Sequence, residues 1–317
     1  MNSIELRAAF SLAFIYVLRM LGLFMIMPVM AVAAREYPDY SAMLVGLAIG
    51  GYGLTQALLQ IPMGVLSDKI GRKPIIIFGL LMFAIGSLVA AFADTLVWVV
   101  IGRFLQGAGA IAIIGVAIGF SFYIALLLGP TIANIYGLKG IFLATGVLAI
   151  LCVFMVLWVV PNAKHVAPKG DTLPVIKDIK VLLAHPQLIR LDISVLILHM
   201  LITLLFVHIP KFFVELNWPL SLHWQLYLVV LLVSIVGLAL MMASARKINQ
   251  VSLLMASVFG LGLVFAMLSI EHSSLLWLLV LVSLFFTCFN YLEANFPALV
   301  SNIAPAGKKG SAMGIYA

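Results

Sequence analysis

Four polar side chains lie inside long apolar stretches of this sequence, where charged or amide groups are rare. They are Arg19, Arg103, Gln106 and Glu293. A charge inside a bilayer is costly unless it is paired, hydrogen-bonded or hydrated, so such residues often belong to ion or proton pathways. Glu293 is therefore a candidate proton carrier or cation partner, and a structural hydrogen bond is its alternative role. For Arg103 the alternative is a side chain that snorkels to the nearer membrane surface.

A second set of charged residues lies between two apolar stretches, in the segment Gly64–Pro74. It contains Asp68, Gly71, Arg72 and Lys73. A charged turn of this kind cannot lie in hydrocarbon, so it marks a surface of the bilayer. Its basic residues indicate the cytoplasmic surface.

The composition excludes a soluble protein. Hydrophobic residues make up 65% of the chain and charged residues only 9%, against roughly 25% charged residues in soluble domains. The net charge of +7 is spread over short connectors, which favours a cytoplasmic excess of basic loops over a nucleic-acid surface. The sequence has none of the motifs HExxH or GxSxG, so it indicates no enzyme, and it predicts no metal site or cofactor.

The apolar stretches predict an all-α membrane protein with about ten transmembrane helices, since each span needs roughly 20 residues. Arg19 interrupts the first stretch, and its length favours a span over a signal peptide. The predicted spans are 8–34, 41–66, 75–93, two within 96–136, 140–160, 188–213, 222–244, 250–270 and 275–300.

At two places the sequence has too few residues for the transmembrane helices that the pattern predicts. With a cytoplasmic N-terminus, all strongly basic loops lie inside only if residues 96–136 cross twice. About 41 residues hold two spans and almost no turn, so we expect that a segment is missing near 111–116. Residues 310–317 begin another helix, so we also expect the chain to end inside it.

The chain divides at its one long hydrophilic stretch. We expect an N-terminal helical bundle over residues 1–160, a cytoplasmic linker over 161–187, and a C-terminal bundle over 188–317. Two hydrophobic halves joined by such a linker are typical of secondary transporters, which hold substrate near the membrane midplane between repeats.

The spacing Gly64-x3-Asp68-x2-Gly71-Arg72-Lys73 resembles the loop signature between helices two and three of the major facilitator superfamily. The resemblance implies a fold of twelve helices in two bundles. It also implies that Asp68 meets the N-terminus of the eleventh helix and that the basic residues form a charge relay. Together these groups would latch the outward-facing state.

Two further motifs fit the same family. Arg103-x-x-Gln106-Gly-x-Gly resembles its fourth-helix motif, whose arginine is linked to proton coupling. Gly129-Pro130 resembles the fifth-helix motif of antiporters, although Ala133 and Asn134 stand where that motif often has two glycines.

The amino-acid sequence along nearly the whole chain, from Leu18–Gly22 to Ala304–Gly307, resembles that of the YajR-type bacterial multidrug exporters of this superfamily. The resemblance implies a monomer in the bacterial inner membrane that exchanges protons for hydrophobic or cationic small molecules by alternating access. Its partners would be substrate, protons and lipid. Two alternatives stay open: a non-transporting remnant or helper protein, and a nutrient uptake symporter.

Overall fold

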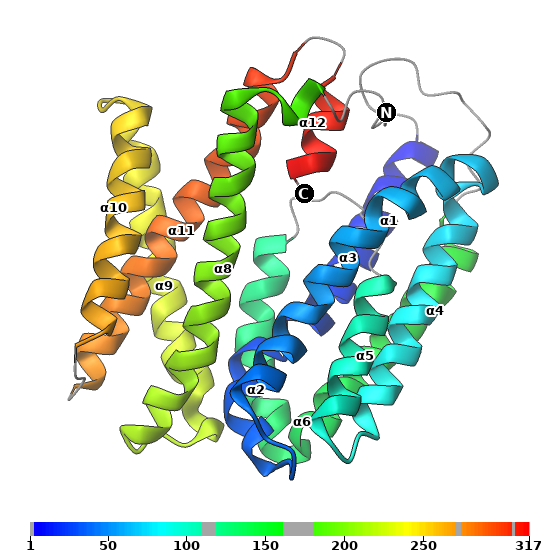
Figure 1. Ribbon diagram of the computed structural model, residues 1–317, viewed down its shortest axis with the longest axis horizontal. Helices are drawn as coiled ribbons and strands as arrows, with labels where there is room; N and C mark the ends of the chain where they lie inside the picture. The colour runs from blue at the N-terminus through cyan, green and yellow to red at the C-terminus, as the bar shows by residue number, and fades with distance from the viewer. Residues whose placement is uncertain (1–2, 110–117, 161–180, 271–273, 306–307, 317) are drawn as a thin grey trace. The chain divides into compact units, whose positions relative to one another are not determined.

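The computed structural model describes residues 3–109, 118–160, 181–270, 274–305 and 308–316, and all regular structure in these residues is helical (Figure 1). Helices of the first half are α1 (Ser3–Phe24), α2 (Met27–Ala33), η1 (Ala34–Glu36), α3 (Ala42–Ile70), α4 (Arg72–Ala91), α5 (Leu96–Ala108) and α6 (Ile118–Trp158). Those of the second half are α8 (Pro186–Glu215), η2 (Leu220–Leu222), α9 (His223–Ser244), α10 (Gln250–Leu268), α11 (Leu275–Ile303) and α12 (Lys309–Tyr316).

Most of these helices match the predicted spans. Within the described ranges, eight helices are long and apolar enough to cross a membrane. Helix α6 consists of two helices that meet at Gly137, and α5 is a shorter apolar helix of 13 residues. Counted with α5 and with both halves of α6, the helices agree with the predicted number of about ten. The segment expected to be missing near 111–116 lies outside the described residues.

One proline and one glycine explain the two helix breaks in the first half. Helix α1 ends at Phe24 and α2 starts at Met27, next to Pro28, which occupies the first turn of α2. Proline has no N–H and is favoured in a first turn, where that N–H would have no partner within the helix. Gly137 has φ 63° and ψ −166°, a backbone conformation that a side chain disfavours.

The predicted turn over Gly64–Pro74 is much shorter than expected. Helix α3 continues to Ile70 and α4 starts at Arg72, so Gly71 alone joins them. Gly71 has φ 97° and ψ 152°, and its N–H donates to the Ser67 carbonyl at 2.9 Å. Because glycine adopts this conformation without strain, the chain reverses direction without a loop.

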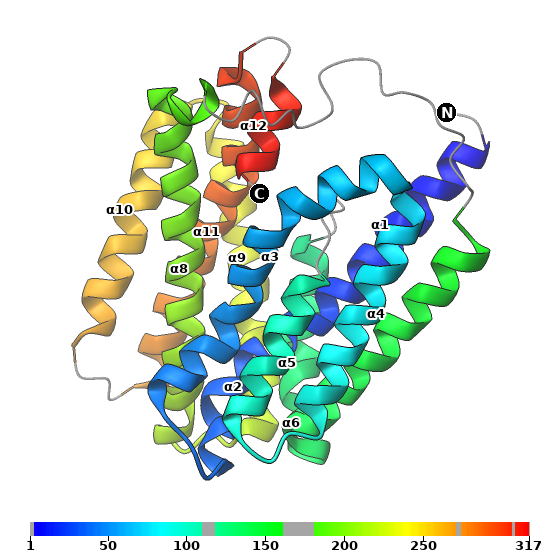
Figure 2. The same ribbon diagram turned by 45° about the vertical axis from the view of Figure 1, so that its right-hand side comes forward.

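The contacts divide the chain into two compact units, each described here by itself. One unit contains Met1–Ala163 together with Thr203–Tyr227. In it, α5 packs against α3 and α4, while α6 packs against α1, α2 and α4. These first-half helices run from blue to green in Figures 1 and 2.

The other unit contains Lys164–Ile202 and Leu228–Ala317. In this unit α11 contacts both α10 and α12. Helices α10 and α11 approach each other closely at Gly260, where an added Cβ would lie 2.7 Å from the sulfur of Cys288. A small core joins α8 and the residues just before it to the end of α11 and to α12, and it consists of Leu182, Leu188, Val300, Ala304 and Ala312.

Asp39 links two loops at one end of the first unit. Its two carboxylate oxygens accept hydrogen bonds from the N–H groups of Leu96 at 2.7 Å and Val97 at 3.0 Å. These are the first two residues of α5, so the carboxylate caps the positive end of that helix. Desolvation alone would raise the pKa of Asp39, but the two backbone N–H groups outweigh it and hold the pKa below its usual value.

Replacing Gly71 with alanine should lower the free energy of unfolding by about 1–3 kcal/mol, because a side chain is strained in this conformation. Gly46→Ala in α3 is the matched control, since an added Cβ there meets nothing within 4 Å. Unfolding in detergent should show a loss for Gly71→Ala and no loss for Gly46→Ala. Equal stability of the two variants would contradict this account of the junction.

Asp39→Ala should lower the thermal midpoint of the protein at neutral pH. The folded pKa of Asp39 lies below the unfolded value of about 3.9, so its stabilisation is present above that pH and is lost as the pH falls through the folded pKa. The variant should therefore show less destabilisation by acid than the wild type. Glu36→Ala, at an exposed carboxylate nearby, should keep the wild-type acid response.

Candidate functional site

A hydrogen-bond network around Arg103 forms the polar centre of the first unit. Arg103 Nε donates to the carbonyl of Ala48 at 2.7 Å, and a terminal nitrogen donates to Gln106 Oε1 at 2.8 Å. Gln106 Nε2 in turn donates to Ser87 Oγ at 2.8 Å, and Ser87 Oγ donates to the carbonyl of Phe83 at 2.8 Å. The network thus crosses from α5 to α3 and α4.

The network is closed to solvent. Arg103 is 1% exposed, and Gln106 and Ser87 are 0% exposed. The snorkelling alternative for Arg103 is therefore wrong, because neutral acceptors inside the bundle hold the guanidinium. None of the described carboxylates forms a salt bridge with Arg103, so carbonyl and amide oxygens stabilise its charge.

Tyr52 packs on the other side of the guanidinium. The Arg103 Cζ lies 5.1 Å from the centre of the Tyr52 ring, a distance suited to a cation–π contact. Tyr52 is 4% exposed and lies within electrostatic range of Arg19 as well. Arg19 is itself 5% exposed. The structure therefore brings both predicted arginines to one buried tyrosine.

Glycines of α5 allow the helices to approach closely enough for these bonds. A Cβ on Gly102 would lie 2.6 Å from the Gly86 carbonyl of α4. A Cβ on Gly107 would overlap the Tyr52 carbonyl of α3, and one on Gly109 would overlap the Gly79 carbonyl of α4. In the motif Arg-x-x-Gln-Gly-x-Gly, the polar residues build the network and the glycines place the neighbouring backbones.

Sequence reasoning missed Ser87 and Tyr52, which complete this site. Ser87 was detectable as a hydroxyl next to Gly86 in the middle of an apolar span. Tyr52 carried a weaker signal, because a tyrosine between glycines in a membrane helix has many possible environments.

Gly129 and Pro130 are buried in α6. A Cβ on Gly129 would overlap the Met25 carbonyl, at the break between α1 and α2. Met25 has 1% exposure and belongs to the main core of the first unit. The antiporter-like motif is therefore a packing site here, and its predicted role in antiport stays a prediction.

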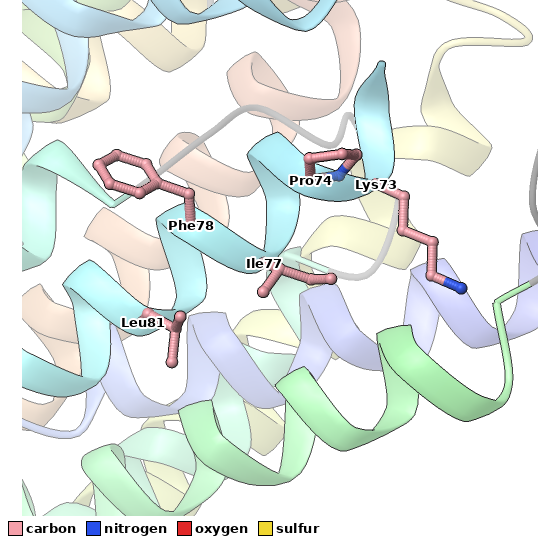
Figure 3. Close-up of a pocket in the computed structure, with 5 residues that line it drawn as sticks. All are labelled: Lys73, Pro74, Ile77, Phe78 and Leu81. Atoms are coloured by element: carbon pink, nitrogen blue, oxygen red, sulfur yellow. The ribbon is translucent and has the colours of Figure 1, made fainter. Parts of the chain in front are cut away.

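Lys73 has hydrogen-bond partners within the first unit that the sequence did not reveal. Its Nζ donates to the carbonyls of Leu157 at 3.2 Å and Val160 at 3.1 Å. These carbonyls belong to the end of α6, where a cation is favourable. Figure 3 shows the lysine leaving α4 toward that end. It borders an open groove of about 520 Å³, whose other lining residues are apolar members of α4.

The remaining parts of the predicted latch stay predictions. Gly64 and Asp68 lie in the last turns of α3, and Arg72 begins α4. The side chains of Asp68 and Arg72 are outside the described part of the structure. So is that of Ser311, near the expected partner of Asp68.

Glu293 lies in α11, and part of its carboxylate is enclosed. Its Oε2 is buried and accepts no hydrogen bond from any described residue. Tyr316 of α12 lies within electrostatic range of both Glu293 and Asp192 of α8, and its hydroxyl is also buried without a described hydrogen-bond partner. Two carboxyl groups of the second unit therefore lie within electrostatic range of one phenol. Nothing in the described geometry holds Oε2 by a structural hydrogen bond.

Comparison with known proteins decides the family. The model of the Major Facilitator Superfamily matches residues 12–110 and 108–317. The chain belongs to this superfamily. It is therefore a multi-pass membrane transporter and not an enzyme.

Individual relatives agree with this assignment. The inner membrane transport protein YajR of Escherichia coli K12 is 38% identical, in an alignment covering 98% of this chain and 74% of that protein. An uncharacterized transporter of Buchnera aphidicola is 32% identical over 100% of this chain and 87% of its own length. Among solved structures, a bacterial homologue of the human lysosomal transporter Spinster has a TM-score of 0.74 at 15% identity. That similarity covers 99% of this chain and 78% of the homologue, and it concerns the fold alone.

Ser87→Ala should lower the free energy of unfolding by about 1–3 kcal/mol, because the Gln106 amide loses its buried acceptor. Ser244→Ala is the control, since Ser244 also donates to the carbonyl four residues before it, at 2.8 Å, but at an exposed site. Its effect should stay within about 0.5 kcal/mol. Denaturation of both variants in the same detergent tests the network, and equal small effects would contradict it.

Proposed function

We propose that this chain is a proton-coupled exporter of hydrophobic or cationic small molecules, which it exchanges for protons by alternating access. It would act as a monomer in the bacterial inner membrane, with its N-terminus in the cytoplasm. The observation that carries the proposal is the half-buried Glu293, whose Oε2 lacks a described hydrogen-bond partner. A carboxyl group in a membrane span is suited to take up and release a proton, and no described donor holds this oxygen of Glu293.

The chemistry of the two buried sites assigns them different roles. A guanidinium stays protonated in proteins, so Arg103 cannot carry the transported proton. Its network of amide, hydroxyl and carbonyl groups keeps a fixed charge in place and braces α5 between α3 and α4. Proton exchange therefore falls to the carboxyl group of Glu293.

The neighbours of Glu293 support an exchange reaction. Tyr316 lies within electrostatic range of Glu293, and Asp192 of the same unit lies within electrostatic range of the same tyrosine. A bound cationic substrate favours the ionised carboxylate of Glu293, and protonation of that carboxylate favours release of the substrate. This competition is the basis of the proposed antiport.

One observation favours a second candidate, a non-transporting membrane protein. Helix α5 has 13 residues, which rise about 20 Å, whereas the hydrocarbon core measures about 30 Å. A fourth span limited to the described residues of α5 would weaken the seal that a transporter needs between two aqueous compartments. Flux through the purified chain separates this candidate from the exporter.

The test uses proteoliposomes that contain the full chain and a pH gradient, with a fluorescent hydrophobic cation as substrate. The proposal expects the cation to move against the direction of proton flow and the movement to stop when the gradient collapses. Glu293→Gln should abolish the gradient-driven part. Glu215→Gln, at an exposed end of α8, should leave it unchanged.

Other results have definite meanings. Cation and proton moving in the same direction would indicate uptake by symport and contradict export. Leakage or no movement from a correctly folded wild-type chain would favour the non-transporting candidate. Full gradient-driven transport by Glu293→Gln would remove Glu293 from the mechanism.

A further inference from the structure

His223 occupies an unusual buried position at the start of α9. It is 0% exposed, and its Nε2 lies 3.0 Å from the carbonyl oxygen of Trp218. A carbonyl oxygen only accepts hydrogen bonds, so Nε2 carries a proton. Nδ1 is buried and has no hydrogen-bond partner among the described residues. A second proton on Nδ1 would be a buried donor without a described acceptor, so this site favours the neutral tautomer with its proton on Nε2.

The turn before His223 fixes the carbonyl that it binds. Asn217 has φ 63°, and the N–H of Trp218 donates to the Phe213 carbonyl at 2.9 Å. The N–H of Asn217 donates to the Val214 carbonyl at 3.0 Å. This pair of bonds is a Schellman motif, which ends α8 in a defined geometry.

Aromatic rings surround the imidazole in the same unit. The Phe213 ring lies 5.3 Å from it and the Tyr227 ring lies 6.3 Å away, both nearly perpendicular to it. Phe206 continues this cluster to Phe122 of α6, at a centroid distance of 5.8 Å. The turn between α8 and α9 is thereby packed against the first-half helices.

Aliphatic contacts reinforce this packing. Leu220 of η2 and Val207 of α8 pack against the core cluster that contains Val29 of α2, Val45 of α3 and Phe142 of α6. Residues Thr203–Tyr227 accordingly belong to the same compact unit as the first-half helices. His223 lies in the same segment and contacts Phe213 and Tyr227 of this unit.

Few ionisable groups are positioned to compensate a charge on His223. Tyr227 is the titratable residue in ring contact with it, and a phenol is neutral near pH 7. On α8, Glu215 and His208 are exposed and Lys211 is partly buried. On α6, Tyr136 is exposed and Lys139 lies over the ring of Phe92.

We propose that His223 is a second proton-coupling residue, whose protonation releases the α8–α9 turn from the first-half helices. The added proton would reside on Nδ1, where no described acceptor is available, and the charge would be buried among aromatic rings. It would also lie at the positive end of α9, which disfavours a cation. Movement of the turn into water removes all three penalties.

This role deepens the proposed function and rests on it for its direction. With a cytoplasmic N-terminus the α8–α9 turn faces the outside of the cell, which is the side from which protons would enter an exporter. Protonation there would favour the state that is open to the outside. The release of the turn itself is a physical property that needs neither substrate nor gradient.

Hydrogen–deuterium exchange of the full chain in lipid nanodiscs tests the release directly. Peptides covering residues 212–228 are compared at about pH 7.5 and about pH 5, on either side of the value near 6.5 at which a water-exposed imidazole ionises. After correction for intrinsic exchange, we expect at least about a tenfold loss of protection in acid. His223→Gln, which keeps a donor for the Trp218 carbonyl but does not titrate, should abolish the acid effect.

The controls separate this inference from a general effect of acid and from the transport proposal. His208→Gln changes an exposed histidine of α8 and should keep the wild-type acid response. If His223→Gln does not fold, His223→Phe provides a second non-titrating side chain of similar size. Equal protection of the wild type at both pH values, or an unchanged acid effect in a folded His223 variant, would overturn the inference. Acid release without transport would support it and reject the exporter.

Discussion

The guanidinium of Arg103 imposes the main constraint on the first half of this protein. A cation enclosed in a membrane bundle requires acceptors within hydrogen-bond distance, because no water is available to supply them. The Ala48 carbonyl and Gln106 Oε1 accept from the guanidinium, and Ser87 Oγ in turn accepts from the Gln106 amide, so the network spans three helices. The glycines of α5 follow from it, since only close backbone contact brings these acceptors within reach. One buried charge thus accounts for the composition of the whole contact between α3, α4 and α5.

The second half of the sequence contributes polar groups of a different chemical kind. Buried atoms without a described hydrogen-bond partner occur in both halves: one terminal nitrogen of Arg103 and the Tyr52 hydroxyl, as well as Glu293 Oε2 and His223 Nδ1. The two halves differ in which groups can exchange a proton. A guanidinium stays protonated, whereas a carboxyl group and an imidazole can take up and release a proton. This chemical difference is the ground on which we assign a fixed charge to Arg103 and proton exchange to Glu293 and His223.

The sequence predicted the helical architecture well, because hydropathy determines which segments can span a bilayer. It also identified Arg103 and Gln106, since polar residues in apolar runs are conspicuous. It failed where the outcome depends on contacts between distant helices. The partners of Lys73 lie more than 80 residues away, and the single-residue junction at Gly71 depends on a backbone conformation that the predicted loop did not anticipate. The environment of His223 likewise follows from aromatic packing that no local pattern indicates.

The central claim is that a proton and a cationic substrate compete for the carboxyl group of Glu293. The most direct measurement is the proton release from the purified chain, in weakly buffered detergent solution, when a hydrophobic cation binds. The account predicts the release of up to one proton per bound cation. Saturable binding of the cation with no release of protons at any pH would contradict the account.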